Sequence, residues 1–222
     1  MVDADLRAGQ GMTSERTRDR LVRQLWNEGI RDGRVLQSMR QVPRHIFVDE
    51  ALASRAYENT ALPIGRSQTI SQPYIVARMT EALLSGETID TVLEVGTGSG
   101  YQTAVLAPLV RRVYTVERIA PLLEQAKQRF RLLKLRNIHP KHSDGGMGLP
   151  EFALYDGIIV TAAPEGIPLS LVEQLRPGAR MVLPIGGVRA QALVKVTRTN
   201  KGYETEMLEP VNFVPLLGGV ET

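Results

Sequence analysis

The sequence lacks cysteine and is poor in histidine, and both shortages limit its chemistry. Without cysteine there is no disulfide framework and no metal site built from thiolates. The three histidines are His45, His139 and His142. His139 and His142 lie three positions apart beside Asp144, but they fall in a short polar segment that we interpret as solvated. We therefore expect no bound metal.

Long apolar runs are also missing. No stretch reaches the roughly 18 apolar residues that a membrane-spanning helix needs, and the start, MVDADLRAGQG, lacks the apolar centre of a signal peptide. Basic residues outnumber acidic ones by only 27 to 24, and a net charge of +3 over 222 residues is a weak electrostatic footprint. We expect a cytoplasmic protein with no membrane partner. The charge alone neither requires nor excludes nucleic acid.

Strands and helices alternate along the middle of the chain. Strand patterns occur at TVLEV, RRVYTVE, NIHPKHSD, LYDGIIVTAA and ARMVLPIG, and helical patterns occur between them at YQTAVLAPL, APLLEQAKQRFRLLKL and PLSLVEQL. This alternation predicts an α/β fold, in which a doubly wound and mostly parallel sheet has helices on both faces. Two or three further strands between Ala192 and Val214 are typical of an antiparallel edge.

The part of the chain before this alternation is predicted to be helical. A first helix starts at Thr13 and carries Leu21, Leu25 and Trp26 on its apolar face, and a second helix ends at Pro43. The chain is long enough to bury one good core and too short to need two. A single domain with additions at its ends is therefore expected.

A glycine motif follows the first strand of the alternating region and reads Glu94-x-Gly96-x-Gly98-x-Gly100. In an open α/β sheet this corner holds the ligand, because glycines permit a sharp turn, a close approach of the ligand to backbone, and tight packing of the next helix. The third glycine comes one place too early for a dinucleotide site, and Tyr101 fills the expected position. The loop also has no lysine followed by serine or threonine, which excludes a P-loop.

An acidic residue stands where it can bind a ribose. Glu117 ends the second strand, 21 positions after Gly96 (117 − 96), and a carboxylate there can accept hydrogen bonds from both ribose hydroxyls. A nucleoside held in this way without phosphate-binding residues indicates S-adenosylmethionine rather than NAD. The motif accordingly resembles the first motif of the class I methyltransferases. HSDG at 142–145 resembles their adenine-contacting turn, which makes Asp144 the acceptor for the adenine amino group.

A second region, TISQPY, has two interpretations. Locally, Ser71 or Gln72 starts a helix as its cap, and Pro73 occupies an early position where its missing N–H costs nothing. However, GRSQTISQPYIVARM and the upstream VPRHIFVDEALASRAYENTALPIG closely resemble the protein L-isoaspartate O-methyltransferase family. The resemblance extends from about Val42 to Leu217 and includes TAAP and VNFVPL.

The resemblance implies a fold, a reaction and a set of site residues. The fold is a Rossmann-like, mostly parallel seven-stranded sheet with a helical N-terminal extension and an antiparallel C-terminal edge. The reaction methylates the free α-carboxylate of an L-isoaspartyl residue in a damaged protein, which leads through a succinimide towards normal aspartate and leaves S-adenosylhomocysteine. Ser71 is the active-site serine, with Thr69, Ile70 and Val214 beside the substrate. The cofactor positions are Glu94, Gly96, Thr97, Gly98, Gly100, Glu117, Arg118, Asp144 and Gly145.

The resemblance also suggests a division of the single domain 1–222. Residues 1–12 are a flexible tail, 13–87 the N-terminal helices and the substrate-side segment, 88–198 the cofactor-binding core, and 199–222 the C-terminal strands. We expect a monomer that binds isoaspartyl peptides and damaged proteins and no nucleic acid. One departure from the animal members of the family is Gln72, where they carry a small residue; this affects peptide preference rather than chemistry.

The expected chemistry needs no general base. A carboxylate acceptor with a pKa near ~4 is already an anion at neutral pH, so we expect Ser71 to orient it by donating a hydrogen bond. No histidine or cysteine accompanies Ser71, so a hydrolytic triad has no support. Two alternatives stay open: a class I methyltransferase acting on RNA or a small molecule, and a binding module that detects damaged peptides without turnover.

Overall fold

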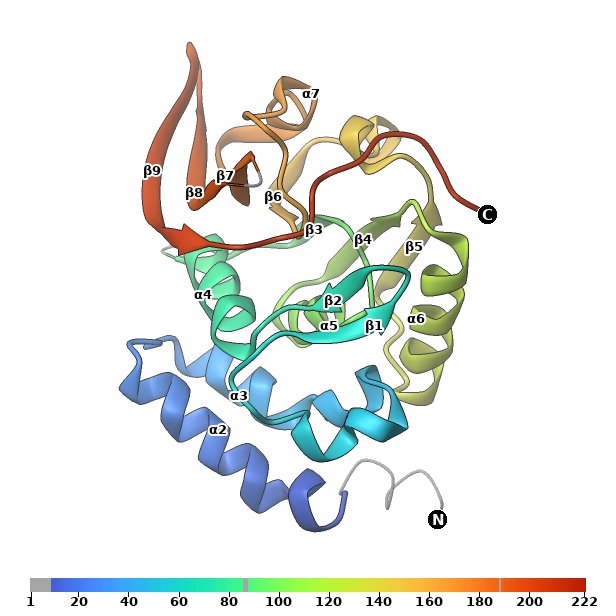
Figure 1. The fold of residues 1–222 in the computed structure, drawn as a ribbon. Coiled ribbons are helices and arrows are strands. Elements are labelled where there is room, and N and C mark those ends of the chain that lie inside the picture. The colour runs from blue at the N-terminus through green and yellow to red at the C-terminus, as the bar shows by residue number, and fades with distance from the viewer. Residues whose placement is uncertain (1–8, 86–87, 188) are drawn as a thin grey trace.

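A seven-stranded sheet forms the centre of the computed structural model, which describes residues 9–85, 88–187 and 189–222 (Figure 1). Its spatial order is β5-β4-β3-β6-β7-β8-β9, in which all neighbours up to β7 pair in parallel and the last two pairs are antiparallel. The predicted doubly wound sheet with an antiparallel C-terminal edge is confirmed. The strands are β3 (Thr91–Val95), β4 (Arg112–Glu117), β5 (Ile138–His142), β6 (Tyr155–Val160), β7 (Leu175–Gly187), β8 (Ala190–Thr199) and β9 (Gly202–Val211).

The central strands are buried on both faces, which explains their continuous apolar sequences. Alternate side chains point to opposite faces, so Val92 packs in one core and Leu93 in the other, and both are 0% exposed. The helices around the sheet are α4 (Pro73–Leu84), α5 (Tyr101–Leu106), α6 (Ala120–Leu132) and α7 (Leu169–Val172). Short 3₁₀ turns lie at Ala107–Leu109 (η4), Gly145–Met147 (η5) and Pro150–Phe152 (η6). No helix among the described residues is long and apolar enough to cross a membrane.

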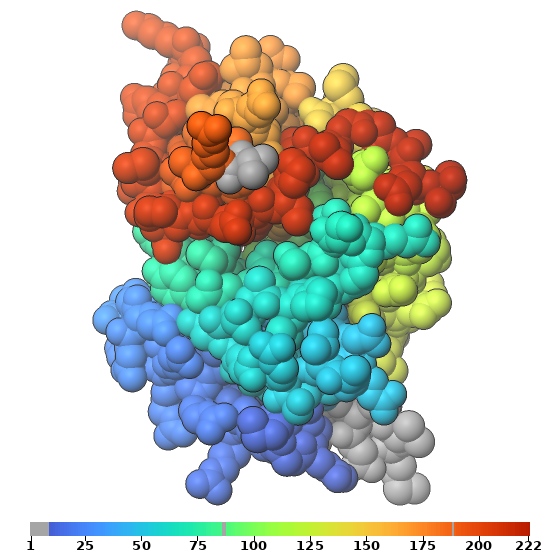
Figure 2. All heavy atoms as spheres, in the orientation of Figure 1, coloured from blue at the N-terminus to red at the C-terminus, as the bar shows by residue number. Residues whose placement is uncertain are grey.

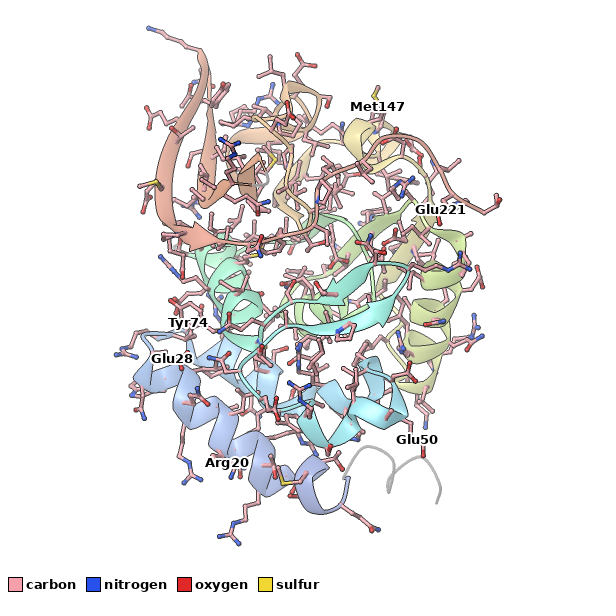
Figure 3. The ribbon with its side chains drawn as sticks, viewed as in Figure 1. Arg20, Glu28, Glu50, Tyr74, Met147 and Glu221 are labelled. Carbon is pink, nitrogen blue, oxygen red and sulfur yellow. The ribbon has the colours of Figure 1, made fainter. Side chains whose placement is uncertain are left out.

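The N-terminal extension packs against the α4–α5 side of the sheet and occupies the lower part of Figure 1. It comprises η1 (Gly11–Thr13), α2 (Glu15–Asn27), α3 (Gly33–Gln41), η2 (Arg44–Phe47) and η3 (Glu50–Arg55). Asn59 ties the extension to α4, because its side chain donates to Glu28 at the end of α2 (2.7 Å) and accepts from the N–H of Tyr74 in α4 (2.9 Å). Figure 3 shows Glu28 and Tyr74 close together at this junction. Residues 1–8 of the predicted tail and residues 86–87 lie outside the described part of the chain.

Two local predictions about helices were wrong. Trp26 is 49% exposed rather than buried, because Leu21 and Leu25 occupy the core-facing positions and the Arg31 guanidinium covers the indole ring at 4.7 Å. The segment PLSLVEQL forms only the short helix α7, and β7 begins already at Leu175, ahead of the predicted strand ARMVLPIG. Tertiary pairing with β6 extends that strand beyond what its local sequence indicates.

A small hairpin and the C-terminal residues complete the front of the molecule. β1 (Leu62–Gly65) and β2 (Gln68–Ile70) pair antiparallel through a turn in which Arg66 and Ser67 both have positive φ, 54° and 56°. Residues 212–222, which we name the C-terminal strap, run back from β9 across the carboxyl ends of the parallel strands. Figure 2 shows the strap as a continuous band directly above the hairpin.

Candidate active site

The glycine motif lies at the point where the order of the strands in the sheet reverses. From β3 the chain proceeds to β4 and β5 on one side and then returns to β6 on the other side, so a crevice opens at the carboxyl end of β3. Gly96, Gly98 and Gly100 all have positive φ, 96°, 52° and 88°. A Cβ on Gly96 would lie 2.4 Å from the Thr161 hydroxyl oxygen, which itself donates to the Gly96 carbonyl. This turn therefore requires glycine.

A pocket opens above the motif, and its volume is about 840 Å³ with the open mouth included. Ten of the residues predicted for the site line it. They are Thr69, Ile70, Ser71, Gly96, Thr97, Gly98, Glu117, Arg118, Gly145 and Val214.

Glu117 is arranged to accept two further hydrogen bonds. It is 6% exposed, and its Oε2 accepts from the Gly98 N–H at 2.8 Å while its Oε1 accepts from the Ile119 N–H at 2.9 Å. A carboxylate has about four lone-pair sites, so each oxygen keeps one for another donor. The same side chain thus holds the glycine loop and presents acceptors that match a pair of neighbouring hydroxyls.

Ser71 carries a hydroxyl that forms no hydrogen bond to any residue that the structure describes. The helix α4 begins at Pro73, its N-cap is Gln72, and no side chain caps it. Of the two predicted helix entries, Gln72 is therefore confirmed together with Pro73 as the first helical residue, and Ser71 as the cap is wrong. Ser71 is half-buried and lines the pocket, and within the described part of the chain its Oγ has no hydrogen-bond partner. The hydroxyl is free to donate to a ligand.

Three predicted site residues do not line the pocket, and two of them support it from behind. Gly100 turns the chain into α5, where a Cβ would lie 2.7 Å and 2.9 Å from ring atoms of Phe130 on α6. Glu94 is 0% exposed beneath the loop, where it accepts from the hydroxyls of Thr103 and Thr115. The Thr115 hydroxyl is in turn 2.6 Å from that of Thr97. Burial raises the pKa of Glu94 to about 8.

Asp144, the third, joins the pocket floor to the strap. Its Oδ1 accepts from the Gly146 N–H at 2.9 Å, and its Oδ2 accepts from the Gly219 N–H at 2.6 Å. Its neighbour Gly145 lines the pocket, and a Cβ there would lie 2.5 Å from Val95. Asp144 therefore lies next to the pocket and uses part of its acceptor capacity within the protein.

The strap forms one wall of the pocket and is tied at several points. Ala163 pairs with it through two backbone hydrogen bonds of 2.8 Å, to Val214 and Leu216. Arg118 donates to the Gly219 carbonyl at 3.2 Å and forms an ion pair with Glu221 at 3.3 Å. Figure 3 labels Glu221 near the end of the strap. The strap thus encloses one side of the pocket.

The remaining residues that line the pocket were not predicted as site residues from the sequence. They are Gln68, Val76, Val95, Ser99, Tyr101, Gln102, Val116, Ile119, Thr161, Ala162 and Pro215–Leu217. Several directly adjoin predicted residues, so their proximity to the motif was the available signal. Thr161 and Ala162 belong to the TAAP segment of the family resemblance, but no role was predicted for them; they come from the end of β6 and reach the site through the strand order. No group of three histidine, aspartate or glutamate side chains that could hold a metal occurs in the described ranges.

Comparisons with known proteins agree with this geometry. The family model described as protein-L-isoaspartate(D-aspartate) O-methyltransferase (PCMT) matches residues 16–221. Protein-L-isoaspartate O-methyltransferase of Halorhodospira halophila is 60% identical over 212 residues, which cover 96% of each chain. The Hahella chejuensis protein of the same name is 61% identical over 209 residues, which cover 94% of this chain and 99% of the relative.

Solved structures lead to the same family. A protein-L-isoaspartate O-methyltransferase structure superposes with a TM-score of 0.82 at 26% identity and covers 91% of this chain and 67% of that one. A Plasmodium falciparum structure named for the same activity, in complex with S-adenosyl-L-homocysteine, has a TM-score of 0.76 at 27% identity and covers 90% and 98% of the two chains. The chain described here belongs to the protein-L-isoaspartate(D-aspartate) O-methyltransferase family.

Proposed function

We propose that the pocket carries out the reaction for which the family is named, the transfer of a methyl group from S-adenosylmethionine to the free α-carboxylate of L-isoaspartyl residues in damaged proteins. The observation that carries the proposal is the position of the unused Ser71 hydroxyl in the same pocket as the Glu117 carboxylate. One side of the pocket suits a nucleoside and the other suits a polar acceptor group.

The residues present fit the cofactor. Glu117 offers one lone pair on each carboxylate oxygen, which matches the two ribose hydroxyls. Gly98 has open space on its ligand side, where a Cβ would meet only the Ile64 side chain, at 3.6 Å. Asp144 and Gly145 adjoin the pocket at the place proposed for adenine. When bound, S-adenosylmethionine supplies a methyl group on a positively charged sulfur.

The chain itself has to align the acceptor rather than activate it. At neutral pH the acceptor carboxylate is already an anion, so Ser71 donates a hydrogen bond that fixes the direction of the attacking oxygen. The hairpin residues Thr69 and Ile70 and the strap residue Val214 form the walls beside Ser71. Alignment together with exclusion of water accounts for the rate without a protein base.

The position of the walls also suggests how a damaged peptide is recognised. The β1–β2 hairpin and the strap are both extended and flank the pocket, so they can offer backbone hydrogen bonds to an extended peptide. Recognition through main chain suits a substrate that occurs in many different sequences.

The first experiment compares two peptides of identical sequence, one with an isoaspartyl linkage and one with normal aspartate. Each is incubated with the protein and S-adenosylmethionine labelled in its methyl group. Base-labile label that enters only the isoaspartyl peptide supports the proposal. No label in either peptide, despite measurable cofactor binding, contradicts the acceptor and redirects the search to RNA or small molecules.

The second experiment tests Ser71 itself. Ser71→Ala removes one hydrogen bond to a charged group, worth about 1.5–3 kcal/mol, so turnover should fall about 10- to 150-fold. The dissociation constant of S-adenosylhomocysteine should stay nearly unchanged. Ser85→Ala, at the far end of α4, is the matched control and should leave turnover intact. A large loss of cofactor affinity in Ser71→Ala would contradict an orienting role.

Other expectations join the proposal. We propose a monomeric, cytoplasmic protein that binds no nucleic acid, with segment boundaries at residues 12, 87 and 198 within one domain. Analytical ultracentrifugation, cell fractionation, a gel-shift assay with RNA and limited proteolysis test these four points in turn.

A further inference from the structure

Arg44 is a wholly buried cation that the proposed chemistry does not use. It lies in η2 of the N-terminal extension and is 0% exposed. Burial lowers its pKa to about 10, so the guanidinium remains charged at neutral pH. Its described contacts include no carboxylate partner, and its Nη1 has no hydrogen-bond partner. Since a buried charge without a counter-ion is costly, the contacts that it does make need an explanation.

Those contacts join two different parts of the protein. The guanidinium Nε donates to the Ala56 carbonyl at 2.8 Å, and Nη2 donates to the Thr60 carbonyl at 3.3 Å. The flat face of the same group covers the ring of Tyr101, with Cζ 4.9 Å from the ring centre. A lysine could not do both, because it lacks the planar fork and the stacking face.

The carbonyl side of Arg44 leads to the acceptor side of the pocket. Thr60 lies two positions before β1, and the β1–β2 hairpin then leads directly to Thr69, Ile70 and Ser71. Arg44 therefore holds the backbone that comes just before this hairpin.

The ring side of Arg44 leads to the cofactor side. Tyr101 is the first residue of α5, directly after Gly100, and it lines the pocket. Its side chain is embedded in the extension, because Phe47 packs edge-on at 5.5 Å and the Tyr101 hydroxyl donates to Met39 Sδ at 3.6 Å. The helix that follows the glycine loop is thus anchored in the N-terminal extension.

We propose that Arg44 is a positioning residue that couples the acceptor side of the pocket to the cofactor side, so that cofactor and isoaspartyl peptide each strengthen the binding of the other. The inference rests on the proposed function. The coupling follows if the first ligand to bind stiffens the contacts centred on Arg44, so that the second ligand meets a pocket that is already ordered. By linkage, the two ligands must raise each other's affinity by the same factor.

The test measures this coupling factor. Calorimetry gives the dissociation constant of S-adenosylhomocysteine alone and with saturating isoaspartyl peptide, and the reverse titration checks the reciprocal value. In the unmodified protein we expect a factor of about 5 or more, as is typical of coupled sites. In Arg44→Lys and in Arg44→Met the factor should fall below about 2.

Controls separate coupling from stability. Leu25→Ala removes a fully buried side chain of α2 that takes no part in the contacts of Arg44 with Ala56, Thr60 and Tyr101, so it should lower the melting temperature and leave the coupling factor unchanged. Tyr101→Leu breaks the same link from the other side and should lower the factor like the Arg44 variants. It keeps the test valid if Arg44→Met does not fold.

The outcomes distinguish the two proposals. If the unmodified protein binds S-adenosylhomocysteine but no isoaspartyl peptide, the proposed acceptor is wrong and this inference falls with it. If it binds both ligands without coupling, or if folded Arg44→Lys and Tyr101→Leu keep the full factor, the role of Arg44 is overturned while the proposed function stands.

Discussion

Replacement of Glu117 tests the assignment of the cofactor side most directly. In the folded protein one lone pair on each carboxylate oxygen is already used, by Gly98 N–H and Ile119 N–H, which leaves two for the ribose. Glu117→Ala removes these acceptors and should weaken cofactor binding by about 1–3 kcal/mol, which is roughly a 5- to 150-fold rise in dissociation constant. Turnover at saturating cofactor should change little, because the proposed arrangement assigns Glu117 to the cofactor and Ser71 to the acceptor.

The assay has to separate direct contact with the ribose from loosening of the glycine loop. Calorimetry with S-adenosylhomocysteine and with its 2′-deoxy analogue, on the unmodified protein and on Glu117→Ala, gives a thermodynamic cycle. If the carboxylate binds the 2′-hydroxyl, loss of that hydroxyl weakens binding to the unmodified protein but has little further effect in the variant. Glu124→Ala, an exposed acid on α6, controls for the change in charge.

Additive losses in the cycle would refute the reasoning about ribose binding. Additivity would mean that Glu117 affects affinity only through the loop that it holds. Unchanged cofactor affinity together with a fall in turnover would refute the assignment altogether, because it would place Glu117 on the acceptor side.

Two further predictions concern residues behind the pocket. Gly100→Ala should destabilise the protein by about 2–5 kcal/mol, of which about 1–2 come from the positive φ and about 1–3 from overpacking against Phe130. Gly178→Ala is the control, because Gly178 has a similar φ of 85° but nothing within 4 Å of the added Cβ, and it should cost only about 1–2 kcal/mol. Equal losses of stability for the two variants in urea unfolding would contradict the ring contact. Burial raises the pKa of Glu94 from 4.5 to about 8, so between these pH values the folded state holds a proton that the unfolded state has lost. The unmodified protein therefore loses stability as pH rises through this window, whereas Glu94→Gln, which cannot titrate there, does not. The stability of Glu94→Gln relative to the unmodified protein should grow by at most about 1.4 kcal/mol per pH unit. A difference that is independent of pH would show that Glu94 ionises normally.

Much of the fold and part of the site could be predicted from sequence because the signals are local. The alternation of strand and helix patterns, the motif from Glu94 to Gly100 and the spacing to Glu117 all depend on residues near one another in the chain. The resemblance to the family relied on equally local segments, such as TISQPY around Ser71. Local periodicity also predicts which residues are buried, but Trp26 is an exception. Leu25, four positions after Leu21, takes the core position next to it, and Trp26 stays exposed.

The sequence by itself determined the sheet, the glycine turn at the carboxyl end of β3 and the type of ligand that this turn accepts, since each follows from backbone geometry and spacing. Only the tertiary structure decided the rest. It placed Glu94 and Gly100 behind the pocket rather than in it, laid the strap over the strand ends, and brought Arg44 between Thr60 and Tyr101. These outcomes depend on which distant segments pack together, and long-range packing leaves no period in the sequence from which it could be read.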